Sequence, residues 1–305
     1  MDSLSLPEVE TWPGPDSAAH ATSMPRLHFI SGLPRSGSTL LTGLLRQNTR
    51  FHARINSPIA RLFRLLLTGM SEEAGFFLDD GQRHRMLHAL FESYYGCIDC
   101  NVAFDSSRGW TAQLPALLRI FPEAKVVCTV RNVAWIMDSI ERLVRANPLI
   151  NSRLLNDESE RANVYTRTDA LAARNRLVGA AWTNLKEAFY GPQADHLLIV
   201  DYDYLTSAPR ETMALIYRFL DEEPFDHDFD NVEYDEPEFD ASLATPGLHH
   251  VGRQVRFTPR RTILPPDLFD RFSKLNFWND SAPNLASRIG PEPKQDAASS
   301  EGATL

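Results

Sequence analysis

Two glycines five positions apart, Gly32 and Gly37, enclose a short loop near the start of the chain that carries Arg35 and runs into Ser38 and Thr39. Glycines at this spacing let the backbone turn tightly, so that successive N–H groups point inward at the oxygens of a bound anion. An apolar run before the loop predicts a buried strand, and leucines at helical spacing after it predict a helix. Because the positive end of that helix dipole faces the loop, the segment predicts an anion site of the phosphate type.

The position after Gly37 separates this loop from that of nucleotide kinases. It holds Ser38, whereas kinases have there a lysine that reaches the β- and γ-phosphates. Arg35 is the only cation in the loop, and one arginine with hydroxyls and backbone amides suits a phosphosulfate better than a magnesium-bound triphosphate. The alternative is a strand-to-helix turn without a ligand, which the flanking strand and helix and the dense polar residues disfavour.

A second arginine follows another predicted strand about a hundred residues later. Residues 126–130 are mostly apolar and are followed by Arg131, and the next predicted helix carries Ser139 eight positions further on. A guanidinium fork at the strand end can clamp a phosphate while the serine hydroxyl donates a hydrogen bond. A surface salt bridge is the ordinary role of an isolated arginine, and it is the upstream loop that favours phosphate binding here.

The elements that must position these residues are strands that alternate with helices. Such alternation predicts an α/β fold with a P-loop-like central parallel sheet flanked by helices. Ligands of such sheets bind beyond the carboxyl ends of the strands, where the glycine loop, Asp105, Arg131 and Asp201 lie, so we expect them to line one crevice. The predicted strands span residues 27–31, 102–105, 125–130 and 196–201, and the predicted helices 59–70, 83–95, 111–121, 134–145, 168–189 and 209–220.

Composition defines the domain organisation and argues against some partners. Residues 1–24 and 285–305 are rich in Ser, Pro, Ala and charged residues and are expected to be flexible, which leaves one domain over residues 25–284. The net charge of −9 argues against a nucleic-acid partner. No basic start with an apolar core and no run of roughly 20 apolar residues is visible, so we expect no membrane segment and a cytoplasmic location.

Residues 34–41 resemble the 5′-phosphosulfate loop of sulfotransferases that use 3′-phosphoadenosine 5′-phosphosulfate (PAPS). An arginine in this loop is typical of the family's tyrosylprotein and bacterial branches. Residues 126–131 with Ser139 resemble its 3′-phosphate element, and residues 200–220 resemble its segment of the form YEDL…P…I..FL. The resemblance runs over residues 27–278 and implies the sulfotransferase fold. It implies that the nucleotide is bound by Pro34, Arg35, Ser36, Gly37, Ser38, Thr39, Arg131, Ser139, Tyr202 and Arg253.

The activity that this resemblance implies is transfer of a sulfuryl group from PAPS, the co-substrate, to a hydroxyl, phenol or amine acceptor. The desulfated nucleotide, PAP, is the second product. Arg35 would stabilise negative charge on the leaving phosphate. No metal is required, because the leaving group carries less charge than a triphosphate. A base is expected to receive the proton of the acceptor.

The identity of this base is where the chain departs from its relatives. The stretches that match the glutamate of the tyrosylprotein branch and the histidine of cytosolic members contain neither residue here. Asp105, which lies in the second of these stretches, is the favoured base, and Arg108 is predicted to contact the transferring sulfuryl group. His52 and His249 are the remaining candidates for the base.

Two other functions stay open on the sequence alone. A P-loop kinase acting on a small molecule would use Asp201 at a strand end to bind magnesium, and a non-catalytic nucleotide-binding protein would account for the missing base. The acceptor stays unidentified, although residues 59–95 and 148–176 are expected to form its pocket, and a homodimer is left open. Residues 221–240 hold eleven carboxylates, which predicts a solvated loop or a flap that selects a cationic acceptor.

Overall fold

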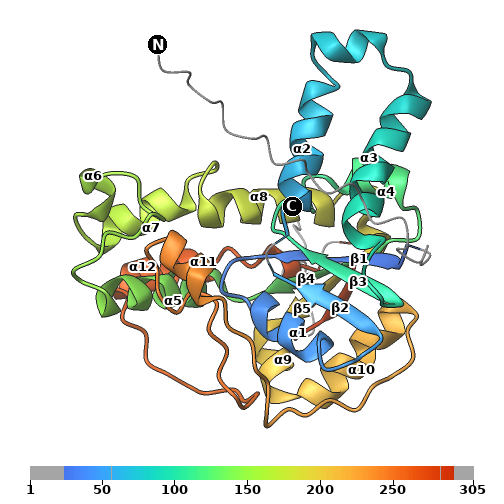
Figure 1. Cartoon of the computed structure of the whole chain (residues 1–305). Helices are drawn as coiled ribbons and strands as arrows, with labels where there is room; N and C mark the ends of the chain where they lie inside the picture. The colour runs from blue at the N-terminus through green and yellow to red at the C-terminus, as the bar shows by residue number, and fades with distance from the viewer. Residues whose placement is uncertain (1–23, 56, 282, 292–305) are drawn as a thin grey trace, which may run out of the picture.

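A sheet of six strands forms the centre of the computed structural model, which describes residues 24–55, 57–281 and 283–291 (Figure 1). All strand pairings are parallel, in the order β2-β3-β1-β4-β5-β6, so that β1 lies between β3 and β4. This confirms the predicted α/β class with a central parallel sheet. The strands are β1 (Arg26–Gly32), β2 (Phe51–Arg54), β3 (Val102–Ser106), β4 (Val126–Val130), β5 (Leu197–Asp201) and β6 (Ser287–Ile289).

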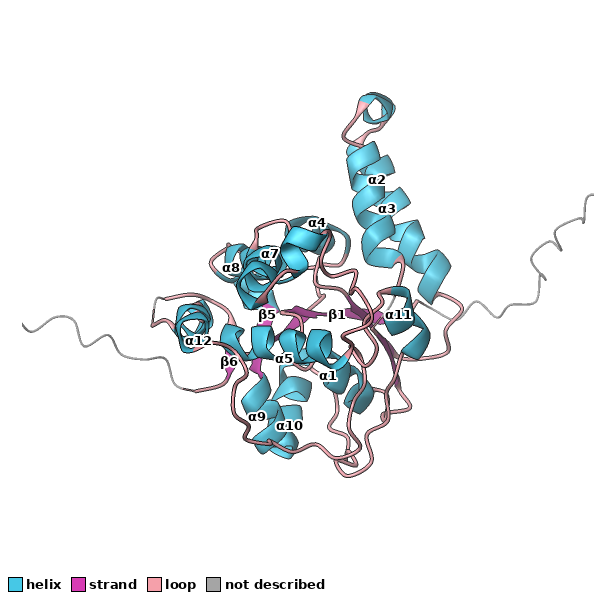
Figure 2. Ribbon diagram, turned by 90° about the vertical axis from the view of Figure 1, so that its left-hand side faces the viewer, coloured by secondary structure: helices cyan, strands magenta, loops and turns pink. Residues whose placement is uncertain are grey.

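Helices cover both faces of the sheet (Figures 1 and 2). One face packs against α1 (Ser38–Leu45), α9 (Tyr202–Ser207) and α10 (Pro209–Leu220). The other face packs against α2 (Ile59–Gly69), α3 (Asp80–Tyr95), α4 (Leu114–Ile120), α5 (Val133–Ala146), α8 (Leu177–Phe189) and α12 (Pro266–Ser273). The other described elements are α6 (Glu158–Arg161), α7 (Val164–Ala172), α11 (Pro237–Ser242), η1 (Glu73–Phe77), η2 (Ala194–His196) and η3 (Phe277–Asn279).

The central strands are buried on both faces, which their sequences require. In β4, Val126, Cys128 and Val130 belong to the larger core cluster, and the intervening Val127 belongs to the smaller one. A nearly continuous apolar run is typical of a parallel strand that is covered by helices on both sides. This pattern made β4 recognisable from the sequence.

Gly32 at the end of β1 allows the phosphate loop to leave the sheet next to β4. Its φ is 109°, a left-handed conformation that strains other residues, and an added Cβ would lie 2.1 Å from the carbonyl oxygen of Thr129. The glycine therefore fixes both the turn direction and the closeness of the loop to β4.

Some predicted boundaries differ from the structure. The prediction that residues 285–305 form a flexible tail is wrong for residues 287–289, which form β6 and pair with β5, while residues 292–305 lie outside the described residues. Of the predicted N-terminal segment only Met24 is described. The single helix predicted over residues 168–189 is divided into α7 and α8, which meet closely because Gly179 leaves room for the carbonyl groups of Ala172 and Ala173.

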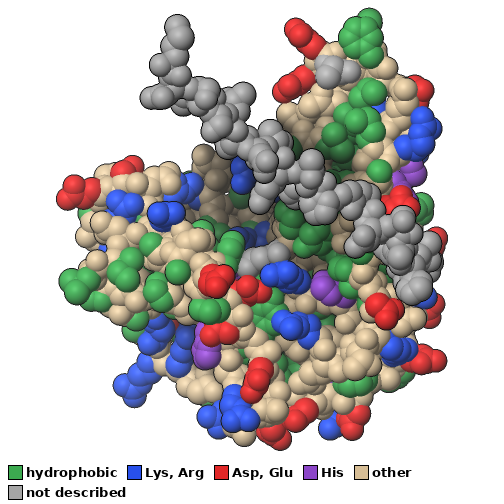
Figure 3. Space-filling model, viewed as in Figure 1, with side chains coloured by type: hydrophobic (Ala, Val, Ile, Leu, Met, Phe, Trp, Pro, Cys, Tyr) green, Lys and Arg blue, Asp and Glu red, His purple; other side chains and the backbone are tan. Residues whose placement is uncertain are grey.

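Helices α2 and α3, joined by η1, form a hairpin that projects from the body (Figures 1 and 2). Figure 3 shows hydrophobic side chains gathered on this hairpin. Among the described residues, no helix has the length and apolar character needed to cross a membrane. The exposed large apolar residues of the hairpin are Leu62, Leu65, Phe76, Phe77 and Met86.

The acidic segment 221–240 is attached to the body by ion pairs. Glu222 lies 3.0 Å from Arg26, and Glu223 lies 3.0 Å from Arg50. Part of its negative charge thus balances arginines of the same chain. Asp240, at its end, is buried and belongs to the site described next.

Candidate active site

The loop between β1 and α1 has the geometry of an anion cradle. Gly37, the N-cap residue of α1, has a φ of 100°, and no side chain of the described residues caps the helix. The first N–H groups of α1 therefore have neither an intrahelical partner nor a capping side chain, and the helix dipole is positive at this end. Arg35 has a φ of 58°, so that two of three consecutive loop residues adopt left-handed backbone conformations.

Ser36 holds the loop in place and does not line the cavity. Its side chain is fully buried, with Oγ 2.8 Å from Thr129 Oγ1 and 2.9 Å from the carbonyl oxygen of the same residue. The predicted nucleotide contact of its hydroxyl therefore does not fit the structure, because that hydroxyl already bonds to β4.

The Arg35 guanidinium joins three parts of the site. Its Nε donates a hydrogen bond to Ser139 Oγ on α5 at 3.1 Å, and its Nη1 donates to the carbonyl oxygen of Leu248. Burial, together with the charges of Arg131 and Arg260, lowers the pKa of Arg35 to about 10. The two arginines predicted to bind one nucleotide are thus close enough to interact.

Arg131 lies over the ring of Tyr202, with its guanidinium carbon 4.1 Å from the ring centroid. Its Nε is buried, and within the described part of the chain this atom has no hydrogen-bond partner and no carboxylate forms an ion pair with the guanidinium. Burial lowers the pKa of this arginine. A buried, unpaired N–H beside a second uncompensated arginine is the environment expected of a group that binds an anionic ligand.

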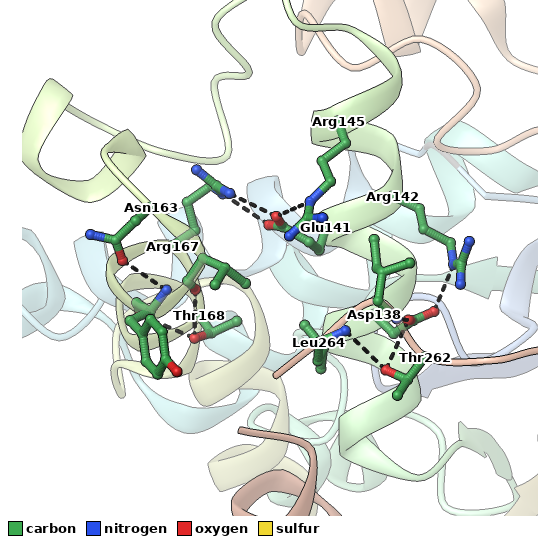
Figure 4. Close-up of polar contacts among 12 residues, drawn as sticks. Asp138, Glu141, Arg142, Arg145, Asn163, Arg167, Thr168, Thr262 and Leu264 are labelled. Atoms are coloured by element: carbon green, nitrogen blue, oxygen red, sulfur yellow. Dashed lines mark hydrogen bonds and ion pairs between the residues drawn. The ribbon is translucent and has the colours of Figure 1, made fainter. Parts of the chain in front are cut away.

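Helix α5, which carries Ser139, is anchored to its neighbours by two of its own buried carboxylates, Asp138 and Glu141 (Figure 4). Asp138 accepts hydrogen bonds from the Ile263 amide at 2.7 Å and from Arg142 Nε at 2.9 Å, and it pairs with Arg260 at 2.8 Å. This arrangement brings Arg260 close to the other two arginines.

Glu141, one turn after Asp138, attaches α5 to α7 (Figure 4). Its Oε1 lies 2.7 Å from Arg145 Nε and 2.7 Å from Arg167 Nη2. Burial alone would raise the pKa of Glu141, but these hydrogen bonds hold it below its ordinary value. The carboxylate is therefore ionised at neutral pH and keeps the helix in place.

Two cavities meet at the end of the phosphate loop. The first, of about 410 Å³, is lined by the loop, Arg131 and the segment 248–256, and the second, of about 420 Å³, by the start of α2 and the turn after β3. The predicted residues that line the first are Pro34, Arg35, Gly37, Ser38, Thr39, Arg108, Arg131 and Tyr202. The residues that line both cavities are Ser38, Thr39, Arg108, Phe239 and His249.

Arg108 lies where it was predicted to act, at the wall between the cavities. Its side chain is open to the cavities, yet the surrounding protein still lowers its pKa by desolvation. Arg253, in contrast, is exposed and lines neither cavity. Its Nη2 donates to Asn231 Oδ1 at 2.7 Å, because its backbone pairs with Val232 on the neighbouring segment, and the structure brings Arg256 to the cavity instead.

Asp105 is a structural carboxylate. It is fully buried and accepts hydrogen bonds from Trp110 Nε1 at 2.8 Å, from Tyr95 OH at 2.6 Å and from Ser57 Oγ. Burial raises the pKa of Asp105 although these donors oppose the shift. The prediction of a catalytic base at this position does not fit the geometry, because both carboxylate oxygens are occupied and neither cavity is lined by this residue.

Two other candidate residues also lie away from the cavities. The ring centroid of His52, on β2, lies 6.3 Å from that of Tyr95, and burial lowers the pKa of His52. Asp201 caps α9 by accepting a hydrogen bond from the Asp203 amide at 2.8 Å, and burial raises its pKa to about 6.

His249 is the candidate base that the structure brings to the site. Its Nδ1 lies 2.6 Å from Asp240 Oδ1, and its backbone N–H donates to Asp240 Oδ2 at 2.9 Å. No sequence pattern marks this pair, since the two residues meet only through the turn that follows α11.

Comparison with known proteins agrees with the resemblance drawn from the sequence. Residues 28–227, about two-thirds of the chain, match the model of a family described as the sulfotransferase family. No curated protein matches the chain.

Solved structures similar to the chain include two sulfotransferases and a dehydratase. The sulfotransferase domain from the curacin biosynthetic pathway is 17% identical, with a TM-score of 0.47 over 84% of this chain and 93% of that one. A sulfotransferase from Mycobacterium avium is 14% identical, with a TM-score of 0.47 over 88% and 80%. A retinol dehydratase in complex with retinol and PAP is 16% identical, with a TM-score of 0.39 over 68% and 63%.

Proposed function

The chain belongs to the sulfotransferase family and is a sulfotransferase, and we propose that PAPS is its sulfuryl donor and a hydroxyl, phenol or amine compound its acceptor. PAPS is the co-substrate that membership of the family implies. The observation that carries the proposal is the pair Arg35 and Arg131 in one cavity, where the buried Nε of Arg131 has no partner among the described residues. An anionic nucleotide with two separate phosphate groups would supply the missing acceptors.

The residues present fit such a donor. The cavity of about 410 Å³ lies within the range of roughly 300–1,000 Å³ that small-molecule sites occupy. One end of it is the uncapped N-terminus of α1, where backbone amides favour a phosphate or sulfate group. Tyr202 and Thr206 from α9 line the wall beside Arg131.

The roles of these residues follow from their positions. The first amides of α1, with Ser38, Thr39 and Arg35, would bind the phosphosulfate, and Arg131 would bind the 3′-phosphate with Ser139 nearby. The donor supplies an activated sulfuryl group. The chain's part is to hold both phosphates in one orientation and to stabilise charge as it develops on the leaving phosphate.

The alternatives that the sequence left open have less support. The kinase alternative depended on Asp201 as a magnesium ligand, and this carboxylate caps α9 and lines neither cavity. The position after Gly37 is a serine, which lacks the charge that a kinase lysine brings to the β- and γ-phosphates.

Isothermal titration calorimetry with PAP and with Mg-ATP tests the donor. We expect PAP to bind at least tenfold more tightly than Mg-ATP, and Arg131→Ala to weaken PAP binding while Arg253→Ala leaves it unchanged. Arg253 is the matched control because it belongs to the segment 248–256 at the first cavity, while Arg253 itself lines neither cavity. Tighter binding of Mg-ATP, or equal effects of the two substitutions, would overturn the assignment. Release of PAP from PAPS with a panel of phenols, alcohols and amines then identifies the acceptor.

A further inference from the structure

His249 lies in the wall that separates the two cavities. It lines both of them, and only 14% of its side chain is exposed. The first cavity contains the arginines assigned to the donor. The second is lined by hydroxyl groups and by Arg61 and Arg108, with no carboxylate among its lining residues in the described part of the chain. A group placed between them can contact both reactants.

Asp240 determines which nitrogen of His249 is free. Because both Asp240 carboxylate oxygens face His249 as acceptors, the 2.6 Å contact with Asp240 Oδ1 places the imidazole proton on Nδ1. Nε2, which has no hydrogen-bond partner among the described residues, then keeps its lone pair. Asp240 is 2% exposed and also accepts from the backbone N–H of His249, so the ring orientation is fixed from two sides.

The charges around the ring leave it neutral. Burial is the main cause that lowers the pKa of His249, the charges of Arg108 and Arg35 lower it further, and only Asp240 raises it. Phe239 packs against the imidazole of His249, with the two ring centroids 5.3 Å apart, and contributes no charge. An imidazole that is unprotonated at neutral pH can accept a proton, and the carboxylate behind it stabilises the imidazolium that forms.

Arg35 fixes the distance between this histidine and the donor loop. Its Nη1 donates to the carbonyl oxygen of Leu248, the residue directly before His249. The cation assigned to the leaving phosphate therefore also holds the segment that carries the imidazole. This contact links the two halves of the reaction through one side chain.

We propose that His249, oriented by Asp240, is the catalytic base of the sulfuryl transfer and that the second cavity holds the acceptor. This inference rests on the proposed donor. Nε2 of His249 accepts the proton of the acceptor hydroxyl while the oxygen of this hydroxyl forms a bond to the sulfur of PAPS. The bond between sulfur and the bridging oxygen of the donor breaks, and its electron pair remains on the 5′-phosphate of PAP. The imidazolium later releases the proton to water.

Chemical modification tests the free nitrogen without any acceptor. Diethyl pyrocarbonate acylates unprotonated, accessible imidazole nitrogens, and mass spectrometry locates the modified residues. We expect His249 to be modified in the free protein, and at least tenfold more slowly in Asp240→Asn, whose side-chain amide no longer holds the proton on Nδ1. If His249 stays unmodified while the exposed His84 reacts in the same sample, the proposal is overturned.

Hydrolysis of PAPS tests the base with water as the acceptor, measured as release of PAP. We expect His249→Ala and Asp240→Asn each to slow hydrolysis by roughly 10²-fold or more, with the double variant no slower than either single one. The rate of the wild type should rise with pH through a midpoint below 6.5, and His249→Ala should lose this dependence. His84→Ala, a histidine of α3 outside both cavities, is the control.

The results separate this inference from the proposed donor. If PAP does not bind to the wild type, the donor assignment fails. If PAP binds to His249→Ala as tightly as to the wild type while hydrolysis and its pH dependence are unchanged, only the base assignment fails. A loss of PAP affinity in parallel with the loss of hydrolysis would mean that His249 serves in donor binding, which also overturns its role as the base.

Discussion

Replacing Arg131 by methionine is expected to weaken nucleotide binding and, at the same time, to leave the free protein as stable as before or more stable. In the structure the guanidinium carbon lies 4.1 Å from the centroid of the Tyr202 ring, and the buried Nε has no hydrogen-bond partner among the residues that the structure describes. A methionine of similar length keeps most of the packing and removes the unpaired polar group. Binding and stability should therefore change in opposite directions.

The magnitudes follow from the contacts that are gained and lost. Two charge-assisted hydrogen bonds to a phosphate contribute about 1.5–3 kcal/mol each. Since the residue is only partly buried, we expect the lower part of the total, which corresponds to an affinity for PAP lowered roughly 10²- to 10³-fold. In the free protein, removal of an unsatisfied buried donor gains about 1–3 kcal/mol, and loss of the contact with Tyr202 costs about 0.5–1 kcal/mol.

Calorimetry with PAP and urea unfolding without ligand measure the two quantities on the same samples. The net expectation for Arg131→Met is a free energy of unfolding raised by up to about 2 kcal/mol, and Arg253→Met should change neither quantity, since Arg253 is exposed. A variant that binds PAP within threefold of the wild type, or that unfolds more easily than the wild type, would refute the reasoning. The first result would place the phosphate elsewhere, and the second would give Arg131 a structural role.

Three further predictions concern stability. Asp105→Asn should lower the free energy of unfolding by about 2–4 kcal/mol, because the amide NH2 group would face the hydrogen-bond donor of Tyr95 or Trp110. The affinity for PAP should stay within threefold of the wild type. An inactive variant with unchanged stability would instead support Asp105 as the catalytic base. Burial raises the pKa of Asp201 from 3.8 to about 6, so between these pH values the folded state binds a proton that the unfolded state has lost. The free energy of unfolding should therefore fall by about 1–3 kcal/mol as the pH rises from 4 to 7. Asp201→Asn keeps the helix cap and should lack this dependence, which urea titrations at several pH values measure. Gly32→Ala should prevent stable folding, since the new Cβ would lie 2.1 Å from a carbonyl oxygen at a φ of 109°, whereas Gly69→Ala, in open space within α2, should raise stability by about 0.5–1 kcal/mol in the same assay.

The parts of the fold that the sequence predicts are those in which local chemistry and tertiary structure agree. The strands β1, β3, β4 and β5 are apolar runs followed by polar or glycine residues, and buried parallel strands have this form. The strands β2 and β6 were missed because they are short edge strands of four and three residues, whose residues carry no apolar run. Their pairing is determined by the neighbouring strand rather than by their own composition.

Within the site, sequence spacing predicted which residues of the phosphate loop and of the strand ends the fold brings to one cavity. Residues 34, 35 and 37–39 of the loop line one cavity together with Arg131, because the neighbouring parallel strands β1 and β4 end at the same edge of the sheet. Asp105 also follows this rule, but it lines neither of the two cavities. The position at a strand end is right, but the side chain is covered by Trp110, Tyr95 and Ser57, and burial of this kind cannot be read from spacing.

The orientations of Arg253 and His249, in the C-terminal half, could not be predicted from the sequence, and both cases have the same cause. Segment 243–261 has no regular secondary structure, so no periodicity tells which side chains face the cavity. Arg253 turns outward because Val232 pairs with its backbone, and His249 turns inward because Asp240 holds both its ring and its N–H. Each orientation is determined by a contact with a residue at least nine positions away.

The two contacts of the Arg35 side chain explain why an arginine with a left-handed backbone conformation suits this loop. Its φ of 58° directs the side chain across the cavity toward α5 and the segment 248–256, rather than along α1. From there Nε reaches Ser139 on α5, while Nη1 reaches the carbonyl oxygen of Leu248. A lysine has a single ammonium group and lacks the planar fork that makes both contacts at once. Arg35→Lys should therefore disturb the position of His249 as well as the binding of the phosphosulfate, and its loss of activity should exceed its loss of PAP affinity.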